Sequence, residues 1–258
     1  MDHASFVEAA AGIFGGLKGG AAAPAPSSWT GGDARASMGG DGLCHIALNF
    51  LGASQSSKDL VPLAVLSTLL GGGDSFSSGG PGKGMTSKLY ENVLNRHHYV
   101  ASALATHFMY GTAGMFTIKG SCDPSAAGQL AGPPSRPLNS QPLFSFIHSF
   151  FTAVLAKELK DCVSSVDAAQ LERARNATAS IVLINSEHGA INAEDMGRQV
   201  MFTGGRVLPQ QLLQQISAVT AQDIQRVAKG LVQSKLAVAA VGDVSYVPSY
   251  DTLQALFK

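Results

Sequence analysis

Residues 71–84 form a glycine-rich run that reads GGGDSFSSGGPGKG. Seven of its fourteen positions are glycine, a residue without Cβ that reaches positive φ freely and lets the backbone approach a ligand closely. On either side, residues 58–70 and 85–95 carry apolar side chains at helical spacing. We therefore expect a mobile loop between two helices that are anchored in a core.

The glycine-rich run matches neither of two common nucleotide-binding motifs. A phosphate-binding Walker loop needs glycine at its first position and Ser or Thr after its lysine. Aligned on Lys83, those positions hold Ser77 and Gly84. A dinucleotide-binding fingerprint follows a strand, whereas residues 61–70 have a helical pattern. A solvated linker without a role is the remaining alternative, but side chains such as Phe76 and Lys83 give the run specific chemistry.

Composition argues against several classes of protein. The formal net charge is zero, with 18 basic and 18 acidic residues, and no basic stripe or polybasic cluster predicts binding to nucleic acid or to a membrane surface. Charged residues make up 14% of the chain, against about a quarter in a typical soluble domain, so we expect partner subunits to cover much of the surface. The longest uncharged apolar run is shorter than the roughly 20 residues of a transmembrane helix, and no secretory signal is expected.

Neither the cysteines nor the neighbouring histidines predict a metal site. Cys44, Cys122 and Cys162 are widely spaced and include no Cys-x-x-Cys, which favours buried thiols in a reducing compartment over a disulfide scaffold or a zinc site. His97 and His98 are consecutive, and consecutive side chains point to opposite faces of a strand and diverge by about 100° on a helix. We expect one of these imidazoles to be buried and the other to be solvated.

The order of elements predicts an α+β fold with an antiparallel or mixed sheet packed by helices. Residues 1–20 form an amphipathic helix that glycines end, residues 21–42 form a flexible linker with Trp29 as a candidate anchor, and residues 43–258 form the main domain. An inserted loop at about residues 125–142 contains prolines that forbid a regular element. Strands are expected at residues 45–51, 99–108, 115–121 and 235–241. Further helices are expected at residues 143–160, 167–186, 194–202, 210–217, 221–231 and 250–257, with caps at Asp167 and Thr220.

Four stretches carry a resemblance to a known family. LLGGGDSFSSGGPGKGMTSKLYENVLNRHHYV at residues 69–100 looks like the glycine-rich loop and following helix of the non-catalytic α-type subunits of the pitrilysin-type metallopeptidase family. HIALNF at residues 45–50, AEDMGRQV at residues 193–200 and VGDVSYVPSYDTL at residues 241–253 are similar to further parts of those subunits. The family includes the subunits of the mitochondrial processing peptidase and the core proteins of ubiquinol-cytochrome c reductase. The resemblance spans nearly everything after Leu43 and implies the same fold.

The resemblance also implies how the chain is organised and what it contacts. Residues 1–20 correspond to the last helix of a preceding N-terminal half, and the rest to the connector and the C-terminal half of an α-type subunit. The implied partners are that N-terminal half, if it is a separate chain, a β-type processing peptidase subunit and other subunits of respiratory complex III. The implied location is the matrix side of the mitochondrial inner membrane.

A substrate-binding site is implied as well. Mitochondrial presequences are basic and amphipathic, and in the family the glycine-rich loop is thought to contact them. The positions carried over are Gly71, Gly72, Gly73, Ser75, Phe76, Gly79, Gly80, Pro81, Gly82, Lys83 and Gly84. Asp74 departs from the family's pattern, which usually has another glycine there. Glu194 and Asp195 stand where the family has an acidic pair implicated in presequence recognition, but Glu194 and Arg198 have equally the spacing of an ordinary surface ion pair on a helix.

Catalytic zinc is not expected in this chain. A zinc peptidase of the family needs His-x-x-Glu-His on a helix. The nearest approach here, INSEH at residues 184–188, has isoleucine in place of the first ligand, so Glu187 and His188 are read as polar residues at a helix end. We expect no catalytic residue and no cofactor here, with zinc in the partner β subunit. The alternative is a purely structural core protein of complex III, and an autonomous peptidase would instead predict zinc in the isolated chain.

Overall fold

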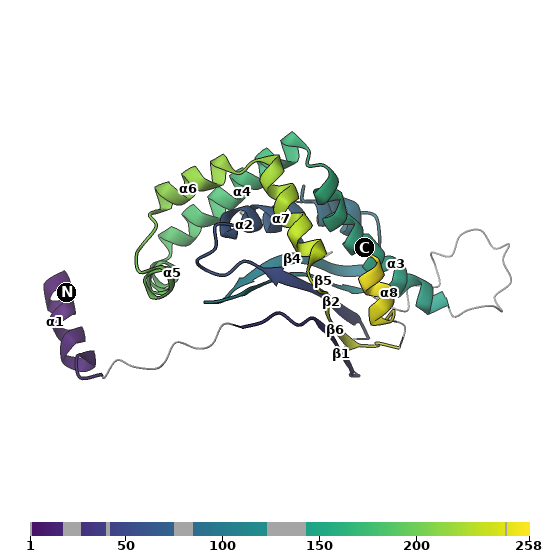
Figure 1. The fold of residues 1–258 in the computed structure, drawn as a ribbon, viewed down its shortest axis with the longest axis horizontal. Coiled ribbons are helices and arrows are strands. Elements are labelled where there is room, and N and C mark those ends of the chain that lie inside the picture. Colours follow the sequence, from purple (N-terminus) through teal and green to yellow (C-terminus); the bar gives the residue numbers. More distant parts are fainter. Residues whose placement is uncertain (1, 18–26, 40–41, 75–84, 123–142, 246) are drawn as a thin grey trace.

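The computed structural model describes residues 2–17, 27–39, 42–74, 85–122, 143–245 and 247–258. A six-stranded sheet lies at the centre, with helices over one of its faces (Figure 1). The strands, in the order β1-β6-β2-β5-β4-β3, are Gly32–Ser37 (β1), Ala237–Gly242 (β6), Cys44–Gly52 (β2), Gly114–Cys122 (β5), Val100–Met109 (β4) and Gly72–Asp74 (β3). β1 and β6 are parallel and the other neighbours are antiparallel. The prediction of an α+β fold with a mixed sheet is therefore confirmed.

The helices follow the apolar periodicity of the sequence. They are α1 (His3–Phe14), α2 (Leu60–Leu70), α3 (Leu143–Ser164), α4 (Ala168–Glu187), α5 (Gly189–Thr203), α6 (Pro209–Ala218), α7 (Ala221–Gln233) and α8 (Tyr250–Ala255), with a π-helical turn η1 at Tyr90–Leu94. Two predicted caps are confirmed: Asp167 accepts a hydrogen bond from the backbone N–H of Gln170 at 2.9 Å, and Thr220 forms a capping box with Asp223. In the described part of the chain, no helix is long and apolar enough to cross a membrane.

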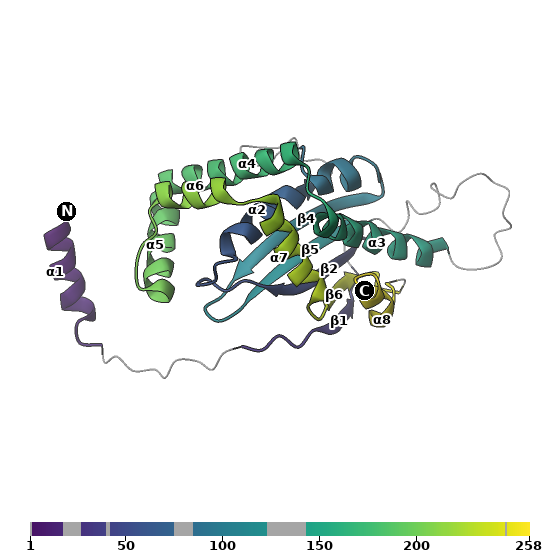
Figure 2. The same cartoon turned by 45° about the horizontal axis from the view of Figure 1, so that its top comes forward.

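The core lies between the sheet and the helices that cover it. α3 packs on α7 and α2 packs on α4, and in both views these helices lie over the same face of the sheet while α1 stands apart (Figures 1 and 2). Each fully buried Leu, Ile or Phe contributes about 1.5–3 kcal/mol to stability. The largest such side chains are Ile46, Leu48, Phe50, Leu66, Leu70, Leu89, Phe116, Ile118, Phe151, Leu155, Leu159 and Ile224.

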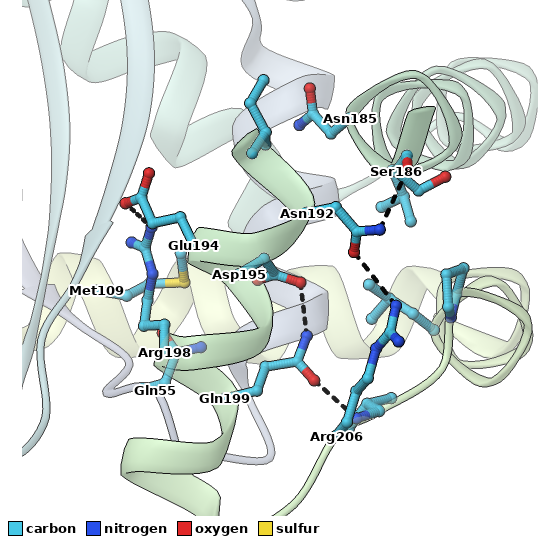
Figure 3. A pocket seen from close by; sticks show the side chains of 15 residues that line it. Gln55, Met109, Asn185, Ser186, Asn192, Glu194, Asp195, Arg198, Gln199 and Arg206 are labelled. Atoms are coloured by element: carbon cyan, nitrogen blue, oxygen red, sulfur yellow. Dashed lines mark hydrogen bonds and ion pairs between the residues drawn. The ribbon is translucent and has the colours of Figure 1, made fainter. Parts of the chain in front are cut away.

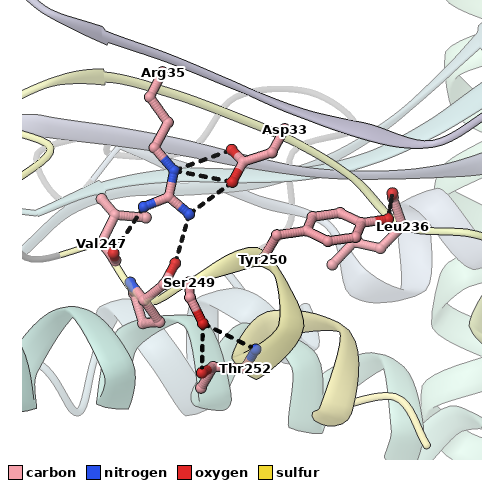
Figure 4. Close-up of polar contacts among 8 residues, drawn as sticks. Asp33, Arg35, Leu236, Val247, Ser249, Tyr250 and Thr252 are labelled. Atoms are coloured by element: carbon pink, nitrogen blue, oxygen red, sulfur yellow. Dashed lines mark hydrogen bonds and ion pairs between the residues drawn. The ribbon is translucent and has the colours of Figure 1, made fainter.

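The predicted linker is wrong in one respect, because Gly32–Ser37 form the edge strand β1. This strand pairs with β6 from Gly32 opposite Ala237 to Ser37 opposite Gly242. Arg35 fixes it from the side: its guanidinium donates to Asp33 and to the carbonyl oxygens of Val247 and Pro248 (Figure 4). The anchor role predicted for Trp29 is confirmed, since its indole Nε1 donates to the carbonyl oxygen of Lys235 at 2.6 Å. The insertion expected at about residues 125–142 lies outside the described residues.

The glycine-rich run begins as a strand and not as a loop. Gly72–Asp74 form β3, which pairs with Ser102–Leu104 of β4, opposite in direction. The backbone N–H of Gly72 also donates to Ser87 Oγ at 3.0 Å. Gly71 and Gly72 have φ of 56° and 103°, conformations that glycine reaches without strain. The helix expected over residues 85–95 is shorter than predicted and contains the wider turn η1, and residues 75–84 lie outside the described residues.

Candidate functional site

A pocket of about 250 Å³ lies where α4, α5 and α6 meet the end of β4 (Figure 3). α5 supplies the acidic pair Glu194 and Asp195 to its lining, and β4 supplies its last residue, Met109. Gln55, from the loop after β2, and Arg206, from the loop between α5 and α6, also line it. Sequence elements that are far apart in the chain therefore converge on the acidic pair.

Local backbone geometry explains why α5 lies across the ends of α4 and α6. His188 has φ of −86° and ψ of 107°, which ends α4 and starts α5 in a new direction. At the other end, Gly204 has φ of 74° in the left-handed region and stops α5. Pro209 then opens α6 at its first position. Along α5, the residues that line the pocket have neighbours three and four positions away and so share one face: Ile191, Asn192, Glu194, Asp195, Arg198 and Gln199.

Both carboxylates of the acidic pair already have partners in the protein. Arg198 Nη2 lies 2.5 Å from Glu194 Oε1, one helical turn away. Gln199 Nε2 donates to Asp195 Oδ2 at 2.7 Å, and Gln199 Oε1 in turn accepts from the backbone N–H of Val207 at 2.7 Å. The ordinary surface ion pair expected for Glu194 and Arg198 is thus present. Asp195, in contrast, faces a neutral amide, so its charge is not compensated by this contact.

A second polar chain crosses the pocket and leaves one acceptor unused. Arg206 donates to Asn192 Oδ1 at 3.2 Å, and Asn192 Nδ2 donates to the carbonyl oxygen of Ser186 at 3.4 Å. The Oε1 atom of Gln55 is buried and makes no hydrogen bond to the described residues. A buried acceptor without a donor costs about 1–3 kcal/mol. A donor reaches this oxygen only if the side chains around it rearrange, and it would then remove that cost.

The two parts of the expected substrate site lie on different elements, β3 and α5, and they do not share one pocket. Gly72 is paired with Leu104 near the middle of β4, while Met109, at the end of β4, lines the pocket with the acidic pair. At about 3.3 Å per residue, the distance along β4 from 104 to 109 is about 17 Å. Gly71 and Gly73 lie beside Gly72 at the sheet edge. The remaining expected positions, Ser75, Phe76, Gly79, Gly80, Pro81, Gly82, Lys83 and Gly84, lie outside the described residues.

Sequence reasoning named the acidic pair as a candidate but did not name the residues that surround it. Gln55 precedes Glu194 by more than a hundred positions, and no local pattern links them. Asn192, Gln199 and Arg206 are ordinary polar residues of a helix and a loop in the sequence. Only the packing of α5 between α4 and α6 brings them to one cavity.

The residues nearest to a zinc motif do not fit a zinc site. Glu187 is the last residue of α4, and His188 caps that helix, which confirms the prediction that both are polar residues at a helix end. Ile184 stands where the first imidazole ligand would be. Among the residues that the structure describes, no cluster of three His, Cys, Asp or Glu side chains could hold a metal ion.

The other candidate metal ligands are where the sequence predicts. Cys44, Cys122 and Cys162 are buried and form no disulfide, and burial raises the pKa of Cys44 to about 11 and that of Cys162 to about 12. Such thiols carry almost no reactive thiolate at neutral pH. His98 is exposed and His97 is half-buried, with its ring 5.6 Å from that of Tyr99. Burial, together with the neighbouring Arg96 and His98, lowers the pKa of His97.

Fold and site together describe an α+β domain with a polar pocket and, in its described part, no cluster fit for a metal. Residues 1–178 match the family described as the peptidase M16 inactive domain. This match covers more than half of the chain, and the chain belongs to that family.

Curated relatives and a solved structure agree with this assignment. The chain is 37% identical to the human mitochondrial-processing peptidase subunit alpha over 212 residues, which cover 82% of this chain and 36% of that protein. It is 35% identical to the subunit alpha of Solanum tuberosum over 263 residues, which cover 100% of this chain and 48% of that protein. The chain thus spans between about a third and a half of these relatives. A structure titled complex III2 from Candida albicans, Inz-5 bound, has the same fold, with a TM-score of 0.79 at 16% identity, over 100% of this chain and 56% of that one.

Proposed function

We propose that this chain is the C-terminal half of an α-type, non-catalytic subunit of the mitochondrial processing peptidase. In this proposal it works on the matrix side of the mitochondrial inner membrane as a core subunit of respiratory complex III, and it presents basic presequences to a zinc-bearing β subunit. An N-terminal half would be supplied by a separate chain if it is separately encoded. The names of the curated relatives support the α-type assignment. The observation that carries the binding role is the position of Glu194 and Asp195 at the pocket.

The geometry is suited to a basic peptide of a few residues. A peptide that lies along β4 from the glycine-rich run to the acidic pair has to cover about 17 Å, which takes about five residues when it is extended. Its basic side chains would form ion pairs with Asp195, whose carboxylate accepts a hydrogen bond from the neutral amide of Gln199. Gln55 Oε1 offers a further acceptor. Apolar side chains of the peptide would contact Met109 and Ile191 in the same pocket.

Cleavage by the reconstituted pair of subunits tests this role at both ends of the site. Replacing Phe76 and Lys83 by alanine should slow the cleavage of a presequence, and so should Asp195→Asn. Asp251→Asn, on the exposed side of α8, is the control, because it changes the net charge by the same amount far from the pocket. Unchanged rates in all of these variants would overturn the proposal and favour a purely structural core protein.

Metal analysis tests the assignment of the zinc to the partner. The isolated chain should bind no stoichiometric zinc, since Glu187 and His188 lack the first ligand of the motif. The reconstituted pair should contain zinc, and a chelator should abolish cleavage. Stoichiometric zinc in the isolated chain, retained through dialysis, would contradict a non-catalytic role.

A further inference from the structure

Arg198 forms an ion pair with Glu194, one of the two carboxylates that would bind an incoming basic peptide. It lies on the same helix as Glu194, four residues later, and its Nη2 atom is 2.5 Å from Glu194 Oε1. Both residues line the pocket, in which Figure 3 shows their ion pair. A peptide guanidinium and the Arg198 guanidinium therefore compete for one carboxylate.

The internal ion pair is weak enough to be exchanged. The side chain of Glu194 is 73% exposed and that of Arg198 is 37% exposed, so water and salt screen their attraction. An exposed ion pair at this helical spacing is only slightly more stable than the same two side chains when each is hydrated separately. Arg198 also has an alternative partner for its donors, because the buried Gln55 Oε1 that lacks a hydrogen bond lines the same pocket.

We propose that Arg198 is a built-in competitor that keeps Glu194 masked until a peptide with more than one basic side chain binds. This inference rests on the proposed function. A peptide with one cation interacts with Asp195, whose partner is the neutral Gln199. A second cation then displaces Arg198 from Glu194, and Arg198 turns its donors towards Gln55. Binding is thereby biased against peptides with a single basic residue, since for them the exchange at Glu194 gives no net gain.

Affinity measurements with defined peptides test this competition. The probe is a short fluorescein-labelled peptide with several arginines on one helical face and leucines on the other, titrated with the 258-residue chain and followed by fluorescence anisotropy. Arg198→Gln should tighten binding about twofold or more, because it removes the competing cation. Glu194→Gln should weaken binding, because it removes a carboxylate and leaves Arg198 to repel the peptide. In the Glu194→Gln background, Arg198→Gln should tighten peptide binding less than it does in the wild-type chain, because no carboxylate is left for it to unmask.

A matched control separates competition from a general change of charge. Lys157 and Asp161 form another exposed ion pair four residues apart on a helix, also at 2.5 Å. Neither residue lines the pocket. Lys157→Gln removes one positive charge, as Arg198→Gln does, and should leave the affinity for the peptide unchanged. A peptide with a single arginine provides the second comparison, since its cation goes to Asp195 and Arg198→Gln should improve its binding less than it improves that of the polyarginine peptide.

Each outcome is informative. If the wild-type chain binds the polybasic peptide and Glu194→Gln weakens that binding, but Arg198→Gln has no larger effect than Lys157→Gln, the competitor role is overturned and the proposed function stands. If neither the wild-type chain nor Arg198→Gln binds the peptide, both ideas fail. Tighter binding by Arg198→Gln, with no change in Lys157→Gln, supports the competition.

Discussion

The guanidinium of Arg35 donates to the carbonyl oxygen of Val247 at 2.8 Å, although 212 residues separate them in sequence. This bond ties β1 to the segment that precedes α8 (Figure 4). A second bond reaches Pro248 at 2.6 Å, and Asp33 holds the guanidinium from the other side. Every residue of β1 is exposed, although the side chains of Arg35 and Asp33 are only 27% and 25% exposed. The strand is therefore held by its pairing with β6, by the contacts of Arg35 and by the Trp29 anchor that precedes it, with no contribution from a buried apolar residue of its own.

Removing that side chain should loosen the edge of the sheet. Arg35→Ala should speed the hydrogen exchange of the amides in Gly32–Ser37 and lower the free energy of unfolding by about 1 kcal/mol. This is less than the roughly 1.5–3 kcal/mol of a hydrogen bond to a charged group, because the site is partly exposed. Hydrogen-exchange mass spectrometry gives the local effect. Arg173→Ala, on the exposed side of α4, is the control. Exchange in β1 that matches the wild type would show that strand pairing alone holds the edge.

Gly72, at the start of the glycine-rich run, should be intolerant of any side chain. A Cβ at Gly72 would lie 1.9 Å from the carbonyl oxygen of Ala103, at a φ of 103°. Gly72→Ala should therefore break the pairing of β3 with β4 and lower the free energy of unfolding by about 1–3 kcal/mol in urea titrations. Gly230 in α7 is the opposite case, since a Cβ there meets nothing within 4 Å. Gly230→Ala should raise stability by up to about 1 kcal/mol, and a loss of equal size in both variants would contradict this account.

Local signals explain most of what could be predicted from the sequence. The helices follow from apolar periodicity, and two of their starts follow from side chains that cap their own helix: Asp167, and Thr220 with Asp223. The strands expected at residues 99–108 and 115–121 are neighbours in the chain and pair with each other as β4 and β5. In each case the physical cause lies within a few residues of its effect, so a short window of sequence contains it.

What could not be predicted depends on distant partners. β1 forms because it pairs with β6, with Gly32 opposite Ala237. No pattern within residues 21–42 predicts that pairing. β3 likewise exists because Ala103 and its neighbours lie beside the glycines. The acidic pair Glu194 and Asp195 could be named from the sequence, but the surrounding pocket could not. It arises only when α5 turns at His188 and meets the end of β4.

A buried polar pair between β2 and β5 should be costly to break. Thr117 Oγ1 donates to Asn49 Oδ1 at 2.8 Å, and Asn49 Nδ2 donates to the carbonyl oxygen of Ala237 on β6 at 3.1 Å. Thr117→Val keeps the shape but leaves the Asn49 oxygen without its donor, so the free energy of unfolding should fall by about 1–3 kcal/mol. Thr106, directly opposite Thr117 on β4 and only half-buried, provides the control. Thr106→Val should change stability by less than about 0.5 kcal/mol, and equal effects of the two changes would refute the argument.

Stability should fall as the pH drops through the range in which His107 gains a proton. The backbone N–H of Ala53 donates to His107 Nε2 at 3.1 Å, so this nitrogen has to be unprotonated, and burial lowers the pKa of His107 below its ordinary value of 6.5. The unfolded chain therefore binds more protons than the folded chain between the two pKa values. Unfolding is favoured as the pH falls below about 6.5, because the slope of stability with pH follows the difference in bound protons.

Replacing the imidazole by an acceptor that does not titrate isolates this effect. His107→Gln keeps an oxygen or nitrogen near Ala53 and removes the titration, so its urea midpoint should change less between pH 7 and pH 5 than that of the wild type. His97, whose pKa is also lowered by burial, is intact in both proteins and contributes equally to each. The difference between the two pH profiles thus reports His107 alone, and parallel profiles would mean that the pKa of His107 is the same in the folded and the unfolded chain.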